Sequence, residues 1–247
     1  MTLLWIIGAS LAESIVSLVG RSLVFLGEER MKRFAHFFLS LSVGTLLGVI
    51  FLDIFPEALE AATANTVFSW TLAGFLLFFV LERALFYYHC HEGECSVHAV
   101  GYLVLFGDAV HNFIDGVIIT LAFLVDLHLG LVTTFAVLLH ELPQEIGDFI
   151  VLLHSGFSRR KVVFYNFLVA LTTVLGALLA YTIVSRFAFQ QLIGPALGLV
   201  AGNFLYIAAS DLVPELHRHA QKKTTFVFEV FLVLLGIFLI AAGNAIL

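Results

Sequence analysis

Two apolar stretches of the sequence contain polar side chains whose spacing would place them on one face of a helix, where they could bind an ion together. In residues 99–124, a ladder on one helical face, at positions i, i+3, i+4 and i+7, comprises Asp108, His111, Asn112 and Asp115. In residues 130–153, two adjacent stripes comprise His140 and Gln144, then Glu141, Glu145 and Asp148. Mixed imidazole and carboxylate groups are ligands for borderline divalent ions such as Zn²⁺, Fe²⁺ or Mn²⁺.

The carboxylates of these stretches would need a counter-charge inside a membrane. One acidic side chain at mid-membrane costs roughly 2.5 to 3.5 kcal/mol, and neither stretch contains a Lys or Arg. Protonation would neutralise the acids, but it would not explain His111 and His140 beside them. A bound cation is therefore favoured over the alternative, in which the polar groups only bridge helices by hydrogen bonds. Pro143 is expected to break its helix and to free carbonyl groups for the ion.

The elements that must position these ladders are membrane helices. Hydrophobic residues make up 61% of the 247 positions, 12% are charged, and the mean hydropathy is +1.05. We therefore expect an all-α integral membrane protein with the lipid bilayer as its partner, no nucleic-acid partner, and a single transmembrane domain over residues 1–247. Eight spans of about 20 residues are predicted near 2–20, 34–55, 67–88, 99–124, 130–153, 162–185, 192–213 and 225–246.

The basic residues sort to one side of these spans. Eleven of the 12 Lys and Arg residues fall in or beside the loops that follow the odd-numbered spans, and only Arg186 falls on the other side. Positive charges mark the cytoplasmic side, so both termini are predicted to lie outside.

Two spans share a motif. The second span reads GTLLGVIFLDIFPE from Gly44, and the seventh reads GNFLYIAASDLVPE from Gly202. Because these spans run in opposite directions, the likeness predicts an inverted repeat that relates helices 1–3 to helices 6–8. The functional interpretation makes Asp53 and Glu57 an outer cation vestibule and Asp211 and Glu215 an inner one. The alternative is that DxxPE only marks a helix end.

A polar loop between the third and fourth spans is rich in metal-binding residue types. Residues 89–98 contain His89, Cys90, His91, Cys95 and His98. In a reducing cytoplasm these thiols would be available to metal, so we expect a receiving or sensing site. The alternative is a solvated loop that happens to be rich in His.

The motifs HNFIDG and HELPQEIGDF resemble the ZIP (Zrt/Irt-like) metal transporters, especially the LIV-1-like branch, which reads HNxxDG and HExPHExGD. The resemblance implies a homodimer in which helices 1, 4, 5 and 6 move against helices 2, 3, 7 and 8. It also implies a one- or two-metal transport site lined by His111, Asn112, Asp115, His140, Glu141, Gln144 and Glu145. Gln144 stands where this branch usually has His, and Asn166 stands where some bacterial members have Glu. Both departures leave the number of metals open.

The sequence thus predicts a carrier that moves a divalent transition metal toward the cytoplasm by alternating access. Zn²⁺ is the expected substrate, with Fe²⁺, Mn²⁺ or Cd²⁺ as other candidates, and the expected location is a prokaryotic inner membrane. One rival is an intramembrane zinc enzyme, because HELPQ begins like HExxH, although its second His is replaced by Gln144. The other is a metal-gated channel or sensor.

Overall fold

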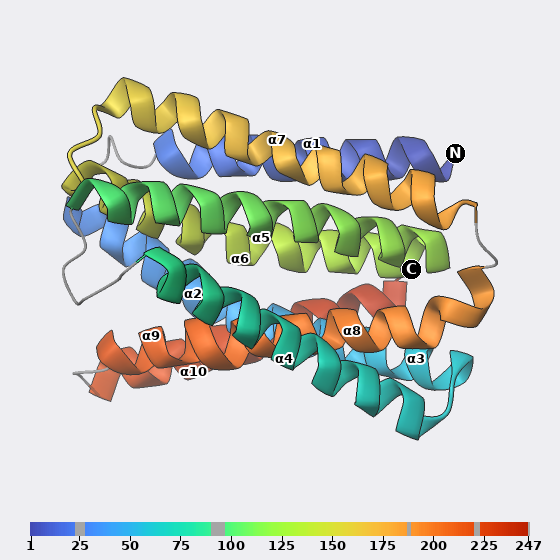
Figure 1. The fold of residues 1–247 in the computed structure, drawn as a ribbon. Coiled ribbons are helices and arrows are strands. Elements are labelled where there is room, and N and C mark those ends of the chain that lie inside the picture. Colours follow the sequence, from blue (N-terminus) through green and yellow to red (C-terminus); the bar gives the residue numbers. More distant parts are fainter. Residues whose placement is uncertain (23–27, 90–96, 187–188, 220–222, 247) are drawn as a thin grey trace.

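The computed structural model of the chain is a bundle of long helices (Figure 1). It describes residues 1–22, 28–89, 97–186, 189–219 and 223–246, and side chains for most of these, and their regular secondary structure is all helical. Uninterrupted α-helices are α1 (Thr2–Ser22), α4 (Ala64–His89), α5 (Val97–Val125), α6 (Leu127–His154), α7 (Arg159–Val184) and α10 (Lys223–Ile246). Met1 and the end of α10 lie at the same end of the bundle.

Two further rods each contain a turn of π-helix. The first consists of α2 (Glu28–Val49), the π-turn η2 (Ile50–Ile54) and α3 (Phe55–Ala61). The second follows a short 3₁₀ turn, η4 (Phe189–Leu192), and consists of α8 (Ile193–Tyr206), the π-turn η5 (Ile207–Leu212) and α9 (Val213–His219).

Six helical stretches in the described part of the chain are long and apolar enough to cross a membrane. They are His36–Ala61, Ala64–Ala84, Val104–Val125, Arg159–Val184, Ile193–Arg218 and Phe226–Ala245. α1 adds a shorter apolar stretch, Thr2–Val16. α6 has 28 residues, or about 42 Å at 1.5 Å each, but its His, Glu and Gln residues make it less apolar. The chain is an all-α, multi-pass membrane protein, and the count of eight spans stays a prediction.

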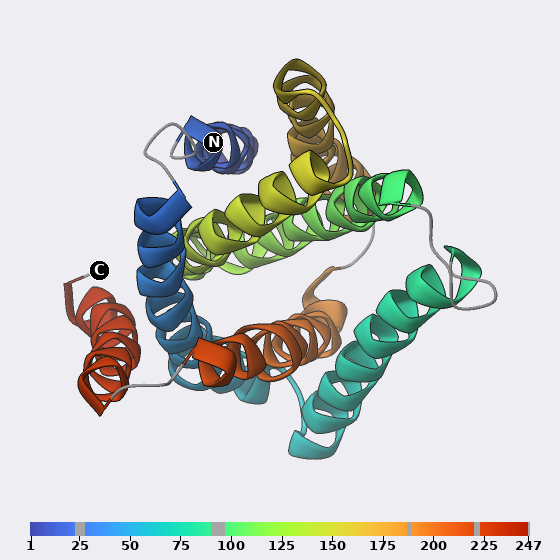
Figure 2. The ribbon, with the colours of Figure 1, turned by 90° about the vertical axis from the view of Figure 1, so that its left-hand side faces the viewer.

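The helices pack as two groups, seen along the bundle in Figure 2. One group contains α1, α5, α6 and α7, and the other contains the two π-containing rods with α4 and α10. Most of the contact between the groups comes from α2 against α6. The polar ladders lie on α5 and α6, so they face the boundary between the groups.

Glycines let helices of the second group approach closely. A Cβ atom at Gly44 in α2 would lie closer than 3.0 Å to the carbonyl oxygen of Val233 in α10. Gly202 in α8 has the same relation to the carbonyl of Thr71 in α4. Each crossing is reciprocal: a Cβ at Gly236 would meet the carbonyl of Leu41, and one at Gly74 would meet the carbonyl of Leu199. The two crossings therefore use positions that correspond under the sequence repeat.

The DxxPE motifs do not end their helices. In η2 the Phe55 amide donates to the Ile50 carbonyl, five residues back, and in η5 the Val213 amide donates to the Ala208 carbonyl. The chain then continues as α3 and α9 through Pro56 and Pro214. The proline itself therefore does not stop the helix, and the first rod ends a little more than one turn beyond Pro56, at Ala61. A proline lacks the amide that its helical turn needs, and the π-turn just before it re-spaces the carbonyls.

The expected break at Pro143 is also absent, because α6 runs without interruption from Leu127 to His154. Proline cannot donate to the carbonyl four residues earlier, that of Leu139. Ser42 of α2 offers a donor in its place, with its Oγ 2.6 Å from the Leu139 oxygen and 2.6 Å from the Phe38 oxygen of its own helix. A hydroxyl of the opposite helix group thus lies within hydrogen-bonding distance of the carbonyl that we had expected to be free for an ion.

Candidate metal site

Two imidazole groups meet where α5 crosses α6. The Nε2 atoms of His111 and His140 are 3.2 Å apart. His140 is fully buried, and its Nδ1 lies 3.1 Å from the carbonyl oxygen of Ala136 one turn earlier. A carbonyl can only accept, so Nδ1 carries the proton and the Nε2 of a neutral His140 presents its lone pair to the cluster. This is the tautomer that a metal ligand requires.

Two carboxylates complete this first group. Asp115 Oδ2 lies 3.2 Å from His140 Nε2 and 3.5 Å from His111 Nε2, and Glu141 Oε2 lies 3.9 Å from His111 Nε2. Ligand atoms of all four side chains lie within 4.8 Å of one another. Asp115 is buried and neither of its oxygens accepts a hydrogen bond. Lone pairs of Asp115 and neutral His140 therefore face each other, an arrangement that a shared cation would stabilise.

A second group contains only carboxylates. Asp108, Glu141 and Glu145 are buried, and one oxygen of each lies within 4.8 Å of the others. Because Glu141 belongs to both groups, the two positions adjoin. Oxygen ligands without imidazole suit harder ions than the first group does.

The two amides of the ladders support the carboxylates. The amide nitrogens of Asn112 and Gln144 lie 2.8 Å and 3.4 Å from Asp108 Oδ1. The Asn112 oxygen accepts from Thr173 of α7 at 3.1 Å. Gln144 thus turns its amide nitrogen toward the site, and that nitrogen cannot bind a metal. The HExxH pattern has a metal-binding imidazole at the same position.

A cavity of about 460 Å³ leads from this cluster to one end of the bundle. It lies between the two helix groups, with α5 and α6 on one side and α4, α8, η5 and α9 on the other. Its polar lining residues are Glu82, Asp108, His111, Gln144, Asp148, Tyr206, Asp211 and Glu215. The cavity therefore joins the core ladders to the predicted inner vestibule, where Glu215 also pairs with Arg218 at 3.1 Å.

The other two motif acids lie apart from this cavity. Asp53 in η2 is 7% exposed, and its Oδ1 lies 3.9 Å from Nδ1 of His128 in α6. Glu57 follows one turn later in α3 and is half-buried. Neither acid lines the cavity. The structure therefore brings Asp211 and Glu215, but not Asp53 and Glu57, into one space with the core.

The predicted loop site lies outside the described residues. Cys90, His91 and Cys95 fall in the segment 90–96, and the side chains of His89 and His98 also lie outside the description, although their backbones belong to α4 and α5. The loop interpretation stays a prediction.

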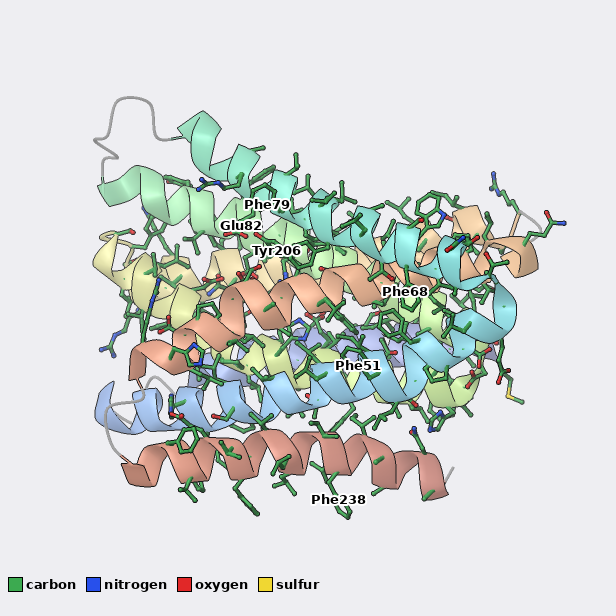
Figure 3. All side chains as sticks on the ribbon, turned by 90° about the horizontal axis from the view of Figure 1, so that it is seen from below. Phe51, Phe68, Phe79, Glu82, Tyr206 and Phe238 are labelled. Atoms are coloured by element: carbon green, nitrogen blue, oxygen red, sulfur yellow. The ribbon has the colours of Figure 1, made fainter. Side chains whose placement is uncertain are left out.

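Several polar residues of the core carried too weak a signal for sequence reasoning to select. Glu82 of α4 accepts a hydrogen bond from the Tyr206 hydroxyl of α8, and Figure 3 shows the pair side by side. In the sequence, Glu82 beside Arg83 looks like an ordinary polar helix end. Glu13 in α1 is fully buried. In the sequence it is a single Glu in an apolar segment. Asn166 in α7, which the family motifs had already singled out, is also fully buried.

The profile of the ZIP zinc transporter family matches residues 91–243. A zinc transporter ZIP13 of Pongo abelii is 35% identical over 191 residues, covering 72% of this chain and 57% of the relative. Zinc transporter zipt-7.2 of Caenorhabditis elegans is 40% identical over 152 residues, covering 59% and 32%. Zinc transporter ZIP10 of Homo sapiens is 38% identical over 131 residues, covering 51% and 16%.

The chain spans about three fifths of the length of the ZIP13 relatives from Pongo abelii, Rattus norvegicus and Mus musculus. The profile match contains α5, α6 and α7 and so includes both ladders and the cluster that they form. Similarity to ZIP13 and ZIP10 agrees with the LIV-1-like branch that the motifs indicated. By its motifs, its helical fold and this match, the chain belongs to the ZIP zinc transporter family.

Proposed function

We propose that the chain carries divalent transition-metal ions across a membrane and binds them at the cluster between α5 and α6. The observation that carries the proposal is the grouping of three buried side chains, Asp115, His140 and Glu141, with the partly buried His111, their ligand atoms lying within 4.8 Å of one another. Neither α5 nor α6 contains a Lys or Arg. A group with this excess of negative charge is best stabilised by a cation that occupies it.

Zn²⁺ is the substrate that the first group fits best. Two imidazole nitrogens and two carboxylate oxygens are a common donor set for zinc, which takes four ligands without a strong geometric preference. Fe²⁺, Mn²⁺ and Cd²⁺ share enough of this chemistry to compete. The relatives named above are zinc transporters, which supports the same choice.

The cavity supports release toward the inner end by alternating access. It connects His111 to Asp211 and Glu215, whereas Asp53 at the opposite end is buried against His128. Such an asymmetric arrangement suits a carrier that holds its site open to one side at a time. The proposed motion slides the group of α1, α5, α6 and α7 along the other group, and most contacts between the groups lie at the α2–α6 boundary.

The inverted repeat is supported by matched details in its two halves. Both DxxPE motifs begin inside a π-turn, and the Gly44 and Gly202 crossings use corresponding partner positions. With this repeat we propose eight spans and both termini outside. Homodimerisation and a prokaryotic inner membrane remain predictions, and the relatives named above are eukaryotic.

Metal uptake into proteoliposomes tests the proposal. Purified protein is reconstituted with a Zn²⁺-sensitive dye inside, and Zn²⁺ is added outside. We expect saturable uptake by the natural chain and none above empty vesicles for His140→Ala, because that change removes a buried ligand. Glu229→Gln is the matched control, since Glu229 is buried in α10 and pairs with His36, away from the cluster. Uptake by His140→Ala equal to the natural chain would refute the assignment.

The same vesicles separate the rival functions. A channel would pass ions at rates that rise in proportion to Zn²⁺, whereas a carrier saturates. An intramembrane enzyme would cleave a peptide or lipid substrate without moving Zn²⁺. Cleavage without uptake would replace the transport proposal.

A further inference from the structure

The hydroxyl of Thr173 in α7 is directed at a side chain of the polar ladder on α5. Its Oγ1 lies 3.1 Å from Asn112 Oδ1, and both residues are fully buried. An amide oxygen carries no proton, so the hydroxyl is the donor of this bond. Thr173 therefore brings a third helix into contact with the ladders that form the metal site.

The nitrogen of the Asn112 amide is held by one residue of the site. Asn112 Nδ2 lies 2.8 Å from Asp108 Oδ1 and 3.0 Å from the Asp108 backbone carbonyl oxygen. A backbone carbonyl can only accept a hydrogen bond, so the nitrogen must face Asp108 and the amide oxygen must face α7. The bonds form a chain in which Thr173 orients Asn112 and Asn112 holds the Asp108 carboxylate.

The packing of α7 against α5 fixes the place of this hydroxyl. The two helices lie side by side along much of their length (Figure 1). A Cβ atom at Gly116 in α5 would lie closer than 3.0 Å to the Thr173 carbonyl oxygen, and one at Gly176 in α7 would lie as close to the Phe113 carbonyl oxygen. Backbones at such short range leave α7 little room to shift along α5. A rigid helix pair thus holds the hydroxyl against Asn112.

Other hydroxyl bridges between these two helices end on the backbone. Thr120 in α5 is fully buried, and its Oγ1 lies 3.1 Å from the Ala177 carbonyl oxygen of α7. The Oγ1 of Thr172 in α7 lies 2.9 Å from the Ala109 carbonyl oxygen of α5. Bonds of that kind join helices and do no more. The bridge from Thr173 differs from these two, because it ends on a side chain of the ladder, so its loss should be felt at the site.

We propose that Thr173 is a positioning residue of the metal site, which acts through Asn112 on Asp108; the proposal rests on the metal-binding function inferred above. Asp108 belongs to the carboxylate group with Glu141 and Glu145, and it is not a member of the group that contains the two imidazoles. Removing the hydrogen-bonding partners that hold metal ligands typically lowers metal affinity by about 10- to 100-fold. Thr173 therefore controls ion binding at the carboxylate group and has little influence on the imidazole group.

Metal binding without transport tests the proposal. Purified protein in nanodiscs is titrated with Mn²⁺ alone, an ion that suits carboxylate ligands, and free Mn²⁺ is followed by electron paramagnetic resonance. Thr173→Val keeps the shape of the side chain and removes the hydroxyl, so we expect it to weaken Mn²⁺ binding by at least about tenfold. Zn²⁺ binding, measured against a chelating dye, should change much less. Thr173→Ser, which restores a hydroxyl, should recover most of the Mn²⁺ affinity.

Thr120→Val is the matched control, because it removes a fully buried hydroxyl from the same pair of helices. It should leave Mn²⁺ binding as in the natural chain. Equal losses in Thr173→Val and Thr120→Val would mean that loosened packing is the cause, and they would reject the proposal. Unchanged Mn²⁺ binding in Thr173→Val, or no Mn²⁺ binding by the natural chain, would reject it too. Thr173→Ala replaces the valine variant if that does not fold, and failure of both to fold beside a folded Thr120→Val would show a structural role instead.

A double-mutant cycle tests the route through Asn112. Asn112→Ala removes the amide and should itself weaken Mn²⁺ binding by about tenfold. In that background Thr173→Val should have little further effect, because the hydroxyl no longer has an amide to orient. Additive losses would show that Thr173 acts on the site by another route, and they would overturn the proposed chain of bonds.

The two proposals fail in different ways. If the chain is not a carrier, the natural protein moves no Zn²⁺ into vesicles, whichever residue stands at position 173. If only the Thr173 proposal is wrong, the natural protein moves Zn²⁺ and the Thr173→Val variant keeps the natural Mn²⁺ affinity.

Discussion

The Ser42 hydroxyl of α2 lies 2.6 Å from the Leu139 carbonyl oxygen of α6, one residue before the candidate ligand His140, and 2.6 Å from the Phe38 carbonyl oxygen of its own helix. The bond to Leu139 crosses the boundary between the helix groups and offers a donor to the carbonyl that Pro143 leaves without its helical donor. Any sliding of α6 along α2 must break it. Ser42 therefore ties the position of the site to the opposite group.

The role of this bond can be measured with a double-mutant cycle. Ser42→Ala should lower the free energy of unfolding by roughly 1 to 3 kcal/mol, because a buried carbonyl loses its donor. In a Pro143→Ala background the backbone amide returns, so the same change should cost about 1 kcal/mol less. Equilibrium unfolding in mixed detergent measures all four proteins. Strictly additive effects would show that Ser42 and Pro143 act independently.

The glycine crossings predict equal sensitivity at two distant positions. Gly44→Ala and Gly202→Ala each place a Cβ against a backbone carbonyl of the neighbouring helix. Each should lower the free energy of unfolding by about 1 to 3 kcal/mol, because backbone must move. Gly8→Ala and Gly147→Ala are the controls, since a Cβ there meets nothing within 4 Å. These should be neutral or stabilise by up to about 1 kcal/mol. If Gly44→Ala is as mild as Gly8→Ala, the close approach is not real.

The residue at position 144 should affect both the affinity for Zn²⁺ and the rate of its release. Gln144 lines the cavity, and its amide nitrogen lies near Asp108. An amide nitrogen has no lone pair available for a metal ion, so this atom is not a ligand. Gln144→His places a third imidazole one turn after His140, and Zn²⁺ should bind roughly tenfold more tightly while leaving more slowly. Competition with a chelating dye gives the affinity, and vesicle uptake gives the turnover. Gln144→Leu, which removes the amide without adding a ligand, should not tighten binding, and equal affinities in the two variants would count against a ligand at 144.

The cavity predicts which side of the membrane can reach the core. In a cysteine-free background, Val104→Cys adds a thiol to the cavity lining. A membrane-impermeant thiol reagent should label it only from the side opposite to the termini, and Zn²⁺ should slow the labelling. Phe238→Cys serves as the control: Phe238 on α10 is 64% exposed and points away from the bundle (Figure 3). Labelling of Val104→Cys from the side of the termini would reverse the proposed orientation.

The ladders could be identified from the sequence because helical periodicity alone puts His111 and Asp115 on one face. The same reasoning could not predict contacts between residues that are far apart in the sequence. Ser42 and Pro143 are 101 positions apart, so nothing local indicated that one compensates for the other. The predicted break at Pro143 failed for that reason. Glu13 and His128 each appeared as a single polar residue, and only the packing of α1 and of η2 against α6 gives them neighbours.

The π-turns explain a further difference from the expected spans. The second span was predicted to end near residue 55, but the rod continues to Ala61. Sequence rules treat proline as a helix stop because they assume regular spacing of hydrogen bonds. That assumption fails at Pro56 and Pro214, where the preceding turn is wider. The repeated DxxPE motif could be recognised in the sequence, whereas the π-turn in which each copy begins could not be predicted from it.

A π-turn holds about one residue more than an ordinary turn, and such bulges are frequent at functional sites. The wider turn absorbs this residue, because it needs more residues for one full rotation, so the segment beyond it keeps its orientation about the rod axis. Deleting one residue from Ile50–Ile54 would therefore regularise the rod while leaving Glu57 on nearly the same face. The same holds for Glu215 and the turn Ile207–Leu212. What such a deletion would remove, in each half of the chain, is the irregular backbone that contains Asp53 or Asp211.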